Sequence, residues 1–304
     1  MKVIFIQSSV AASTQLSKIR LSLLSLIVMT GLAANTANAA LASQVLPVKY
    51  HAGQYCPSDM KAFVPKGTAH KNFVADISCM RQQLQAYQAE HQPINTRFQA
   101  YKADAWLSYV GHEDSEASLT KAGHYALNEA LSILEALKTN QVDKLPLTAD
   151  IPPTSGLQRP DLWASLLTIK QTPAFTPLVK TVADSEVKLI WAEAEFCEFG
   201  WRHSREHYSA ADRWVATAEL TALNTSGVDK QSFNGLKTQY LARLKPLAGT
   251  KNSKQSCRGA VLPYIELPKV GIAEPSPQPL PLPVVVPVAS PIELNSAFKP
   301  AIVG

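Results

Sequence analysis

The chain lacks an apolar run long enough to span a membrane, and it has few charged residues. The apolar stretch near the N-terminus, Leu21–Met29, falls well short of the roughly 20 residues that a membrane-spanning helix needs. Only 17% of the 304 residues are Asp, Glu, Lys or Arg, and no block of Lys or Arg occurs. We therefore expect neither a transmembrane segment in the mature chain nor nucleic acid as a partner.

Several motifs that carry well-defined chemistry are absent too. The sequence contains no G-x-S-x-G nucleophile turn, no P-loop and no G-x-G-x-x-G dinucleotide-binding motif. No base is paired in sequence with a Ser or Cys nucleophile, so nucleophilic catalysis has no positive support. We accordingly expect no cofactor and favour a protein that is not an enzyme.

The first 39 residues have the three parts of an export signal. Lys18 and Arg20 precede the apolar stretch Leu21–Met29, and Ala37-Asn38-Ala39 forms a small-residue cleavage site. Cleavage before Ala40 would leave a mature chain outside the cytoplasm, and the lack of a nearby Cys argues against lipidation. The signal contains three of the basic residues, so the formal net charge of +5 falls by three units on cleavage.

All four cysteines lie after this segment. An even number of cysteines in an exported chain favours two disulfides. Of the three possible pairings we favour Cys56–Cys79 and Cys197–Cys257, because each would tie an irregular segment to a helix. Unpaired buried thiols are the alternative, and the absence of a C-x₂₋₄-C pair opposes a zinc site of four cysteines.

Apolar residues recur at helical spacing along most of the mature chain, as at Ile77 and Met80, and strand-like alternation is absent from about 70 to 250. Pro93 should end the first helix, Asn95 should cap the second, and the polar segment 111–115 should separate the second from the third. The predicted helices cover 73–90, Asn95 to the break at 111, 118–138, 161–169, 175–199, 203–223 and 229–247.

Two parts of this helical region resemble each other. Trp106 is followed after a turn by His124-Tyr125, and Trp191 is followed after a turn by His207-Tyr208, at spacings of 18 and 16 residues. Each part would be a Trp-bearing helix, a short turn and a second helix. The pattern predicts two antiparallel helical hairpins of the tetratricopeptide kind, with chance similarity as the alternative.

The C-terminal part has a different composition. Ten prolines lie between Pro263 and Pro300, and they favour extended polyproline II over helix or sheet. This tail is expected to be disordered, either without a role or as a spacer or docking peptide. The expected parts of the chain are a signal peptide (1–39), an irregular segment (40–70), an all-α domain of two hairpin units (71–260) split by a proline-containing loop near 144–160, and a Pro-rich tail (261–304).

The segment His203-Ser204-Arg205-Glu206-His207 matches H-x-x-E-H, a zinc-peptidase pattern. On a helix, His203 and His207 would share a face as metal ligands and Glu206 would act as general base, so the alternative function is a zinc-dependent hydrolase. No spacing marks a third ligand, and Arg202 and Arg205 add positive charge. The simpler interpretation is an exposed helix start whose histidines cap or pack.

Two groups of carboxylates are further candidates for cation binding or acid–base work. They are Glu113, Asp114 and Glu116 with His112 in the expected break, and Glu193, Glu195 and Glu198 on the expected long helix. The first group is more typical of a solvated turn before a helix N-terminus. The second is more typical of a solvated edge that faces Arg202 or Arg205.

The tryptophans lie at helical spacing among apolar residues, so most are expected in the core. One or two of them could instead line a groove for a sugar or peptide. The five are Trp106, Trp163, Trp191, Trp201 and Trp214.

Segments 100–107 and 122–130, together with Trp201-Arg202-His203-Ser204, resemble the helical N-terminal region of OmpA-family cell-envelope proteins of Gram-negative bacteria. The resemblance covers roughly residues 75–225. In those proteins the helical region precedes an OmpA-like peptidoglycan-binding domain, for which the chain after Cys257 is too short and irregular. The resemblance therefore implies a periplasmic location and a helical module without known chemistry.

These observations favour a non-enzymatic periplasmic scaffold or binding module of the bacterial cell envelope. The expected partners are envelope proteins or peptidoglycan-associated proteins. The helical faces and the tail would be its contact surfaces.

Overall fold

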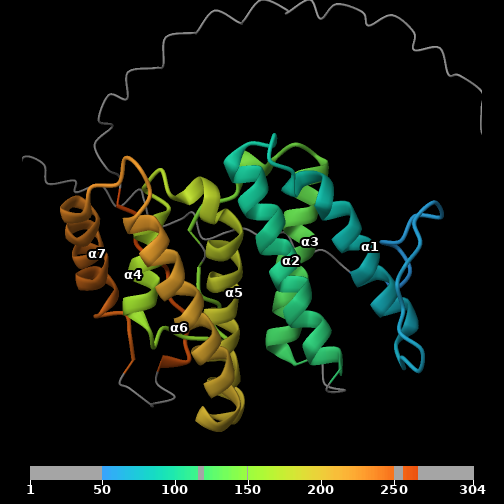
Figure 1. Cartoon of the computed structure of the whole chain (residues 1–304). Coiled ribbons are helices and arrows are strands. Elements are labelled where there is room, and N and C mark those ends of the chain that lie inside the picture. The colour runs from blue at the N-terminus through green and yellow to red at the C-terminus, as the bar shows by residue number, and fades with distance from the viewer. Residues whose placement is uncertain (1–49, 116–119, 149, 250–255, 266–304) are drawn as a thin grey trace, which may run out of the picture. The chain divides into compact units, whose positions relative to one another are not determined.

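The computed structural model describes residues 50–115, 120–148, 150–249 and 256–265, and these are mostly helical (Figure 1). No strand occurs in these ranges, where an isolated antiparallel bridge joins Ile151 to Ala260. The expected all-α fold is confirmed. The helices are α1 (Lys71–Gln88), α2 (Ile94–Ser115), α3 (Lys121–Lys138), a short 3₁₀ turn η1 (Val142–Lys144), α4 (Pro160–Ile169), α5 (Phe175–Phe199), α6 (Trp201–Leu223) and α7 (Lys230–Leu244).

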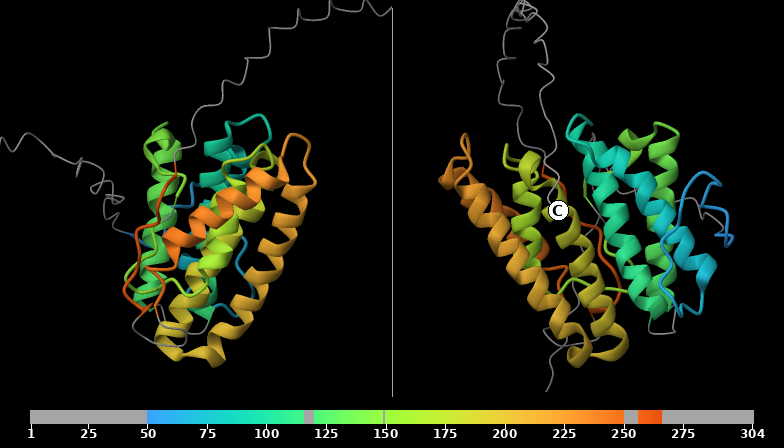
Figure 2. Two further views of the ribbon diagram at one scale, coloured as in Figure 1. Left: turned by 90° about the vertical axis from the view of Figure 1, so that its left-hand side faces the viewer. Right: turned by 45° about the vertical axis from the view of Figure 1, so that its right-hand side comes forward.

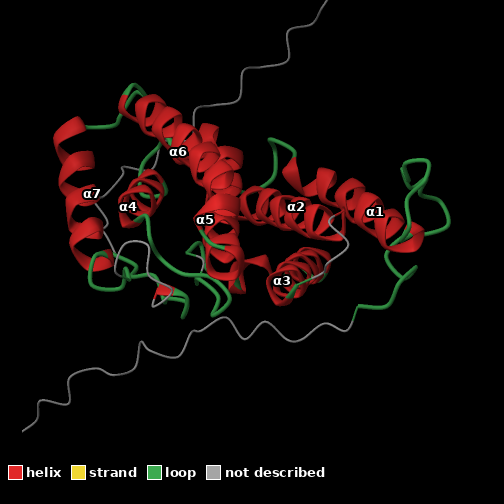
Figure 3. Ribbon diagram, turned by 90° about the horizontal axis from the view of Figure 1, so that it is seen from below, coloured by secondary structure: helices red, strands yellow, loops and turns green. Residues whose placement is uncertain are grey.

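The long helix α5 lies in the middle of the helical unit (Figure 3). On one side it packs against α2, which also contacts α1 and α3. On the other side it packs against α6 and α4, and α4 in turn contacts α7 (Figures 1 and 2). The adjacent pairs α2–α3 and α5–α6 are the two segments that resemble each other in sequence. Their likeness to tetratricopeptide repeats stays a prediction.

Local sequence sets where several of these helices begin and end. The Thr120 hydroxyl accepts a hydrogen bond from the Gly123 amide at 3.2 Å, and Asp229 caps α7 in the same way at 2.7 Å. Pro160 stands at the first position of α4, where its missing N–H costs nothing. Gly200, with a φ of +86°, joins α5 directly to α6, a conformation that side chains with a Cβ rarely adopt.

Two predictions about α2 are wrong. The segment 111–115 is the last turn of α2 rather than a break, because Val110 and Glu113 are buried and continue the packed face of the helix. Asn95 lies inside the first turn instead of capping it, and its side-chain amide donates a hydrogen bond to the Val142 carbonyl at 3.2 Å. Polar residues did not end the helix here because they have partners within the fold.

The cysteines pair as predicted. Cys56 is bonded to Cys79 and Cys197 to Cys257, with Cα atoms 5.1 and 5.7 Å apart. The first disulfide ties the N-terminal loop to α1, and the second ties the C-terminal segment to α5. Each stabilises the fold by about 2–4 kcal/mol, chiefly because it restricts the unfolded chain.

The packed body extends further toward the C-terminus than the sequence suggested. The predicted start of the tail at 261 is too early, because Leu262 and Ile265 are only 5% and 8% exposed. Ile151 and Ala260 exchange two backbone hydrogen bonds of 2.8 and 3.0 Å, which hold this segment beside the loop before α4. The apolar side chains of residues 256–265 therefore complete the core.

Parts of the predicted organisation lie outside the described residues, namely 1–49 and 266–304, and predictions for them stay untested. From residue 50 to α1 the chain is irregular, as expected. Across the ranges that the structure describes, no helix is both long and apolar enough to cross a membrane.

The burial of Leu262 and Ile265 generates a prediction about truncation. A mature chain that ends at Ile265 should unfold with the same free energy as the chain that ends at Gly304. A chain that ends at Val261 should lose roughly 3–6 kcal/mol, because two buried aliphatic side chains are removed. Chemical denaturation of the three proteins measures this, and equal stability of the two truncated chains would contradict it.

Candidate functional site

A cleft of about 540 Å³ opens between the N-terminal loop, the start of α1, the end of α2 and the start of α3. This volume lies in the range of small-ligand sites. Its lining combines apolar and aromatic surface with three imidazoles, one carboxylate and one amide. The lining residues are Tyr50, His51, His70, Phe73, Asp114, His124, Leu127 and Asn128.

One wall of the cleft is fixed by Asp76, which is buried in α1. Its carboxylate accepts hydrogen bonds from the Tyr50 hydroxyl at 2.8 Å and from the Gly53 and Tyr55 amides at 2.6 and 3.1 Å. Burial and the hydrogen bond to Asp76 raise the pKa of the Tyr50 phenol, which therefore remains a neutral donor. The loop that carries His51 is thus anchored on both sides of that residue.

Hydrogen bonds also orient two of the three imidazoles. The Nδ1 atom of His70 lies 2.6 Å from Oδ1 of Asp114. The Nδ1 atom of His124 lies 2.9 Å from the carbonyl oxygen of Thr120. Each ring therefore uses its Nδ1 in a contact within the fold, and both residues line the cleft.

Sequence reasoning found only part of this cleft. Asp114 was noted as a member of an acidic group and His124 as part of the internal repeat. His51 and His70 were missed because they come from a loop and a helix start that no motif spacing connects to α2 and α3. The pairing of His70 with Asp114 spans 44 residues of sequence, so only the fold reveals it.

The expected acidic group on α2 is divided between different partners. Glu113 is buried, and its carboxylate accepts a hydrogen bond from the Thr120 hydroxyl at 2.6 Å. Burial raises the pKa of Glu113, and the Thr120 hydrogen bond partly opposes this. Asp114 faces His70 instead, and Glu116 lies outside the described residues. The described carboxylates therefore do not act as a pair.

Aromatic stacking joins the two Trp-bearing helices. Tyr109 of α2 stacks on Trp191 of α5 at 4.6 Å between ring centroids, and Trp191 stacks on His207 of α6 at 4.3 Å. Trp106 extends the stack from Tyr109 at 6.3 Å and meets Tyr125 of α3 edge-on at 6.0 Å. Four of the six residues that define the internal repeat, Trp106, Tyr125, Trp191 and His207, thus meet in one aromatic ladder across α2, α3, α5 and α6.

Lys188 lies at the end of this ladder. Its Nζ is 3.8 Å from the centroid of the Trp191 ring and 3.3 Å from Nδ1 of His207. Burial, followed by the charges of Lys188 and His112, lowers the pKa of His207 to about 4. The neutral His207 ring accepts a hydrogen bond from the Lys188 ammonium, so the pair is a structural contact.

The lowered pKa of His207 generates a prediction about acid stability. In the unfolded chain the His207 imidazole binds a proton at an ordinary pKa near 6.5, whereas in the folded chain its pKa is about 4. Stability therefore falls as the pH is lowered from about 6.5 to about 4. A His207→Phe variant keeps a stacking ring but removes this loss. Between pH 7 and pH 4 its free energy of unfolding should fall by roughly 1–2 kcal/mol less than that of the parent.

The matched control is His203→Phe on the same helix, at an exposed position. Urea denaturation at several pH values measures all three proteins. Parallel pH curves for the parent and the His207→Phe variant would contradict the prediction.

The H-x-x-E-H segment does not gather a metal site in the described part of the chain. His203 and Glu206 are exposed, whereas His207 packs on Trp191 with a lysine at its Nδ1. Within the described ranges, the group of three His, Cys, Asp or Glu ligand atoms that lie within 4.8 Å of one another is found elsewhere, around α5. The zinc-hydrolase interpretation therefore gains no geometric support.

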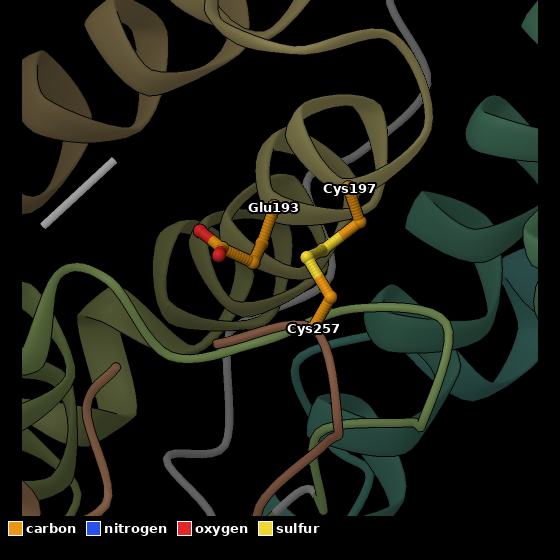
Figure 4. A group of neighbouring side chains, drawn as sticks. All are labelled: Glu193, Cys197 and Cys257. Atoms are coloured by element: carbon orange, nitrogen blue, oxygen red, sulfur yellow. A yellow bond between two sulfur atoms is a disulfide. The ribbon is translucent and has the colours of Figure 1, made fainter. Parts of the chain in front are cut away.

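That other group surrounds a disulfide. Figure 4 shows the sulfur atoms of Cys197 and Cys257 joined to each other beside Glu193, so neither thiolate is available as a ligand. Glu193 is a structural acceptor instead, for the Ser256 hydroxyl at 3.1 Å and for the Tyr208 hydroxyl. Burial raises the pKa of Glu193 to about 7.

The expectation that Glu193, Glu195 and Glu198 form a solvated edge is wrong for the first two, which are buried. Glu195 accepts a hydrogen bond from the indole N–H of Trp191 at 3.1 Å. Glu198 is exposed, as expected. The prediction failed because α5 is packed against α2, α4 and α6, which leaves it little solvated surface.

A third buried carboxylate on α5 forms an ion triad. Glu186 lies between Lys170, which follows α4, and Lys102 of α2, whose Nζ is 3.6 Å from Oε2 of Glu186. Lys170 also donates to the Leu147 carbonyl and lies over the Phe98 ring, 4.5 Å from its centroid. Burial, assisted by the charge of Lys102, lowers the pKa of Lys170 to about 8 despite the attraction of Glu186.

This triad generates a prediction about Glu186→Gln. The change removes the carboxylate that contacts both buried lysines, so we expect a loss of roughly 2–5 kcal/mol in the free energy of unfolding. Glu90→Gln, at an exposed position after α1, should change stability by less than about 0.5 kcal/mol.

A triple variant distinguishes loss of charge balance from loss of packing. Replacing Lys102 and Lys170 by Met and Glu186 by Leu should restore much of the stability, because the three charges of the triad are then removed together. Thermal and urea unfolding measure the series. Near-parental stability of Glu186→Gln alone would refute the structural role of the triad.

The tryptophans divide into two sets. Trp106, Trp163 and Trp191 are buried, as predicted, but Trp201 and Trp214 of α6 are 52% and 39% exposed. Trp201 and the exposed Phe199 flank Gly200, so two large aromatic side chains reach solvent at the turn between α5 and α6. Such exposed aromatic surface is suited to contact with a partner.

Comparisons with models of protein families, with curated proteins and with solved structures give no match to this chain. The resemblance to the helical region of OmpA-family envelope proteins therefore stays a prediction. Inferences about function rest on the geometry described above.

Proposed function

We propose that the protein is a non-enzymatic scaffold or binding module of the bacterial periplasm, engaged with envelope proteins or peptidoglycan-associated proteins. One observation carries this proposal: residues 256–265 are attached to the helical body. The Cys197–Cys257 disulfide and the buried side chains of Leu262 and Ile265 hold them there. Nine prolines follow in residues 266–304. The Pro-rich segment would thus extend from a fixed point, which suits a docking peptide or spacer.

The buried charged groups of the body are consistent with this role. Glu186 joins α5 to α2 and to the end of α4, and Glu193 joins α5 to α6 and to the C-terminal segment. Burial accounts for the lowered pKa of Lys170 and the raised pKa of Glu193. In enzymes, such perturbed groups are typically directed toward a substrate. Here they hold elements of the fold together.

The proposed location has its own support. Residues 1–39 have the composition of an export signal, and two disulfides persist best in oxidising compartments outside the cytoplasm. The resemblance to periplasmic regions of OmpA-family envelope proteins points to the same compartment.

Affinity capture from a bacterial envelope extract tests the proposal. The bait is the mature chain 40–304, compared with chain 40–265, which keeps every described residue. A partner that docks on the tail should be retained by the longer chain and depleted at least about tenfold with the shorter one. A full-length variant with Pro275, Pro277, Pro279, Pro281 and Pro283 changed to Gly should retain less of it, because glycine lacks the preference of proline for polyproline II.

A variant of the body provides the matched comparison. Phe199→Ala with Trp201→Ala removes the exposed aromatic side chains at the α5–α6 turn but leaves the tail intact. Partner retention by both chain lengths, abolished by this variant, would place the contact on the body. Failure of all forms to retain an envelope protein would refute the scaffold proposal.

A further inference from the structure

Three of the seven histidines of the chain line one cleft, although they come from three separate parts of the fold. His51 lies in the N-terminal loop, His70 at the start of α1 and His124 in the first turn of α3. We propose that this cleft binds a first-row transition-metal ion, such as Zn²⁺ or Cu²⁺, through these three imidazoles, with Asp114 as the partner that orients His70. The proposal does not depend on a role in the envelope.

The hydrogen bond of His124 fixes the tautomer that a metal requires. Its Nδ1 is 2.9 Å from the carbonyl oxygen of Thr120, and a carbonyl oxygen can only accept. In the neutral ring the proton therefore resides on Nδ1 and the lone pair on Nε2. This is the arrangement by which proteins commonly present a histidine ligand, with a backbone carbonyl behind the ring.

The contact of His70 with Asp114 has the same polarity. The carboxylate lies 2.6 Å from Nδ1 and accepts its proton, so the lone pair of the neutral ring again resides on Nε2. A carboxylate behind a histidine raises the basicity of the ring and fixes its orientation, as in carboxylate–histidine–zinc arrangements. His70 and His124 thus each contact, through Nδ1, one of the two groups that commonly lie behind metal-bound histidines, a carboxylate or a backbone carbonyl.

Stability alone does not explain this arrangement. The His70 side chain is 60% exposed, and an exposed ion pair contributes at most about 1 kcal/mol to folding. Asp114, in contrast, is only 14% exposed, and it lines the cleft together with His70. A partly buried carboxylate that holds an exposed imidazole at the edge of a cleft is better explained by a ligand of that imidazole.

The third imidazole comes from the N-terminal loop. His51 is exposed, and its loop is held to α1 by the Tyr50 and Gly53 hydrogen bonds to Asp76. Within the described residues, the cleft histidines and Asp114 do not bring three ligand atoms within 4.8 Å of one another. Binding to the roughly 2.1 Å of a Zn–N bond therefore requires side-chain movement, chiefly of the exposed His51, while His70 and His124 keep their Nδ1 contacts.

Titration of the chelator-treated mature chain 40–304, with its disulfides intact, tests the proposal. The probe is ZnSO₄ in isothermal titration calorimetry, and the visible absorption of added Co²⁺ is the second readout. We expect one ion per chain. His70→Gln and His124→Gln should each weaken binding at least about tenfold, and Asp114→Asn about 10- to 100-fold, because the last removes only a second-shell partner.

His203→Gln is the matched control, because His203 belongs to the H-x-x-E-H segment outside the cleft. It should leave the affinity unchanged. His51→Gln alters only an exposed loop side chain, so it keeps the test informative if another variant fails to fold. Circular dichroism of every variant verifies the helical fold.

Three outcomes would overturn the proposal. They are the absence of saturable binding, equal affinity in the parent and in the His51→Gln, His70→Gln and His124→Gln variants, and loss of binding with His203→Gln. The last outcome would place the metal on α6 instead.

Discussion

A buried carboxylate held between two buried ammonium groups constrains this fold more strictly than its apolar packing. Glu186 of α5 meets Lys102 of α2 and Lys170 after α4, and all three side chains are nearly inaccessible to solvent. Separating a buried charge from its partner is strongly destabilising, so the three elements must keep their positions. Apolar packing is non-directional and would fix the orientation of the α2–α3 pair on the α5–α6 pair less well.

The other special contacts extend this constraint in both directions along the chain. The ladder of Tyr109, Trp191 and His207 joins the same two helical pairs through aromatic surface. Glu193 and the adjacent disulfide then tie the C-terminal segment to α5, and Asp76 with the other disulfide ties the N-terminal loop to α1. Polar groups in the interior thus act where distant parts of the chain must be held in one arrangement.

The helices and the disulfides could be predicted from the sequence because periodicity, prolines and cysteine spacing are local signals. Predictions failed where long-range packing decided the outcome. Segment 111–115 is polar yet helical because the Glu113 carboxylate accepts a hydrogen bond from Thr120. Glu193 is buried because its carboxylate accepts hydrogen bonds from Tyr208 and Ser256. Asp114 and His124 could be singled out from the sequence, but not their place in one cleft, because no pattern links His51 and His70 to α3.

One wall of the cleft depends on the Cys56–Cys79 disulfide, so the shape of the cleft depends on whether the protein is in an oxidising compartment. The loop with His51 is one wall of the cleft, and it reaches α1 through the Asp76 carboxylate and, a few residues later, through Cys56–Cys79. Hydrogen bonds to a charged acceptor contribute about 1.5–3 kcal/mol each, so the carboxylate and the covalent bond share the restraint. In a reducing compartment this wall would lose the covalent part of its restraint, and the C-terminal segment would lose its bond to α5. The cleft and the packed body are therefore both expected to be most stable in an oxidising compartment.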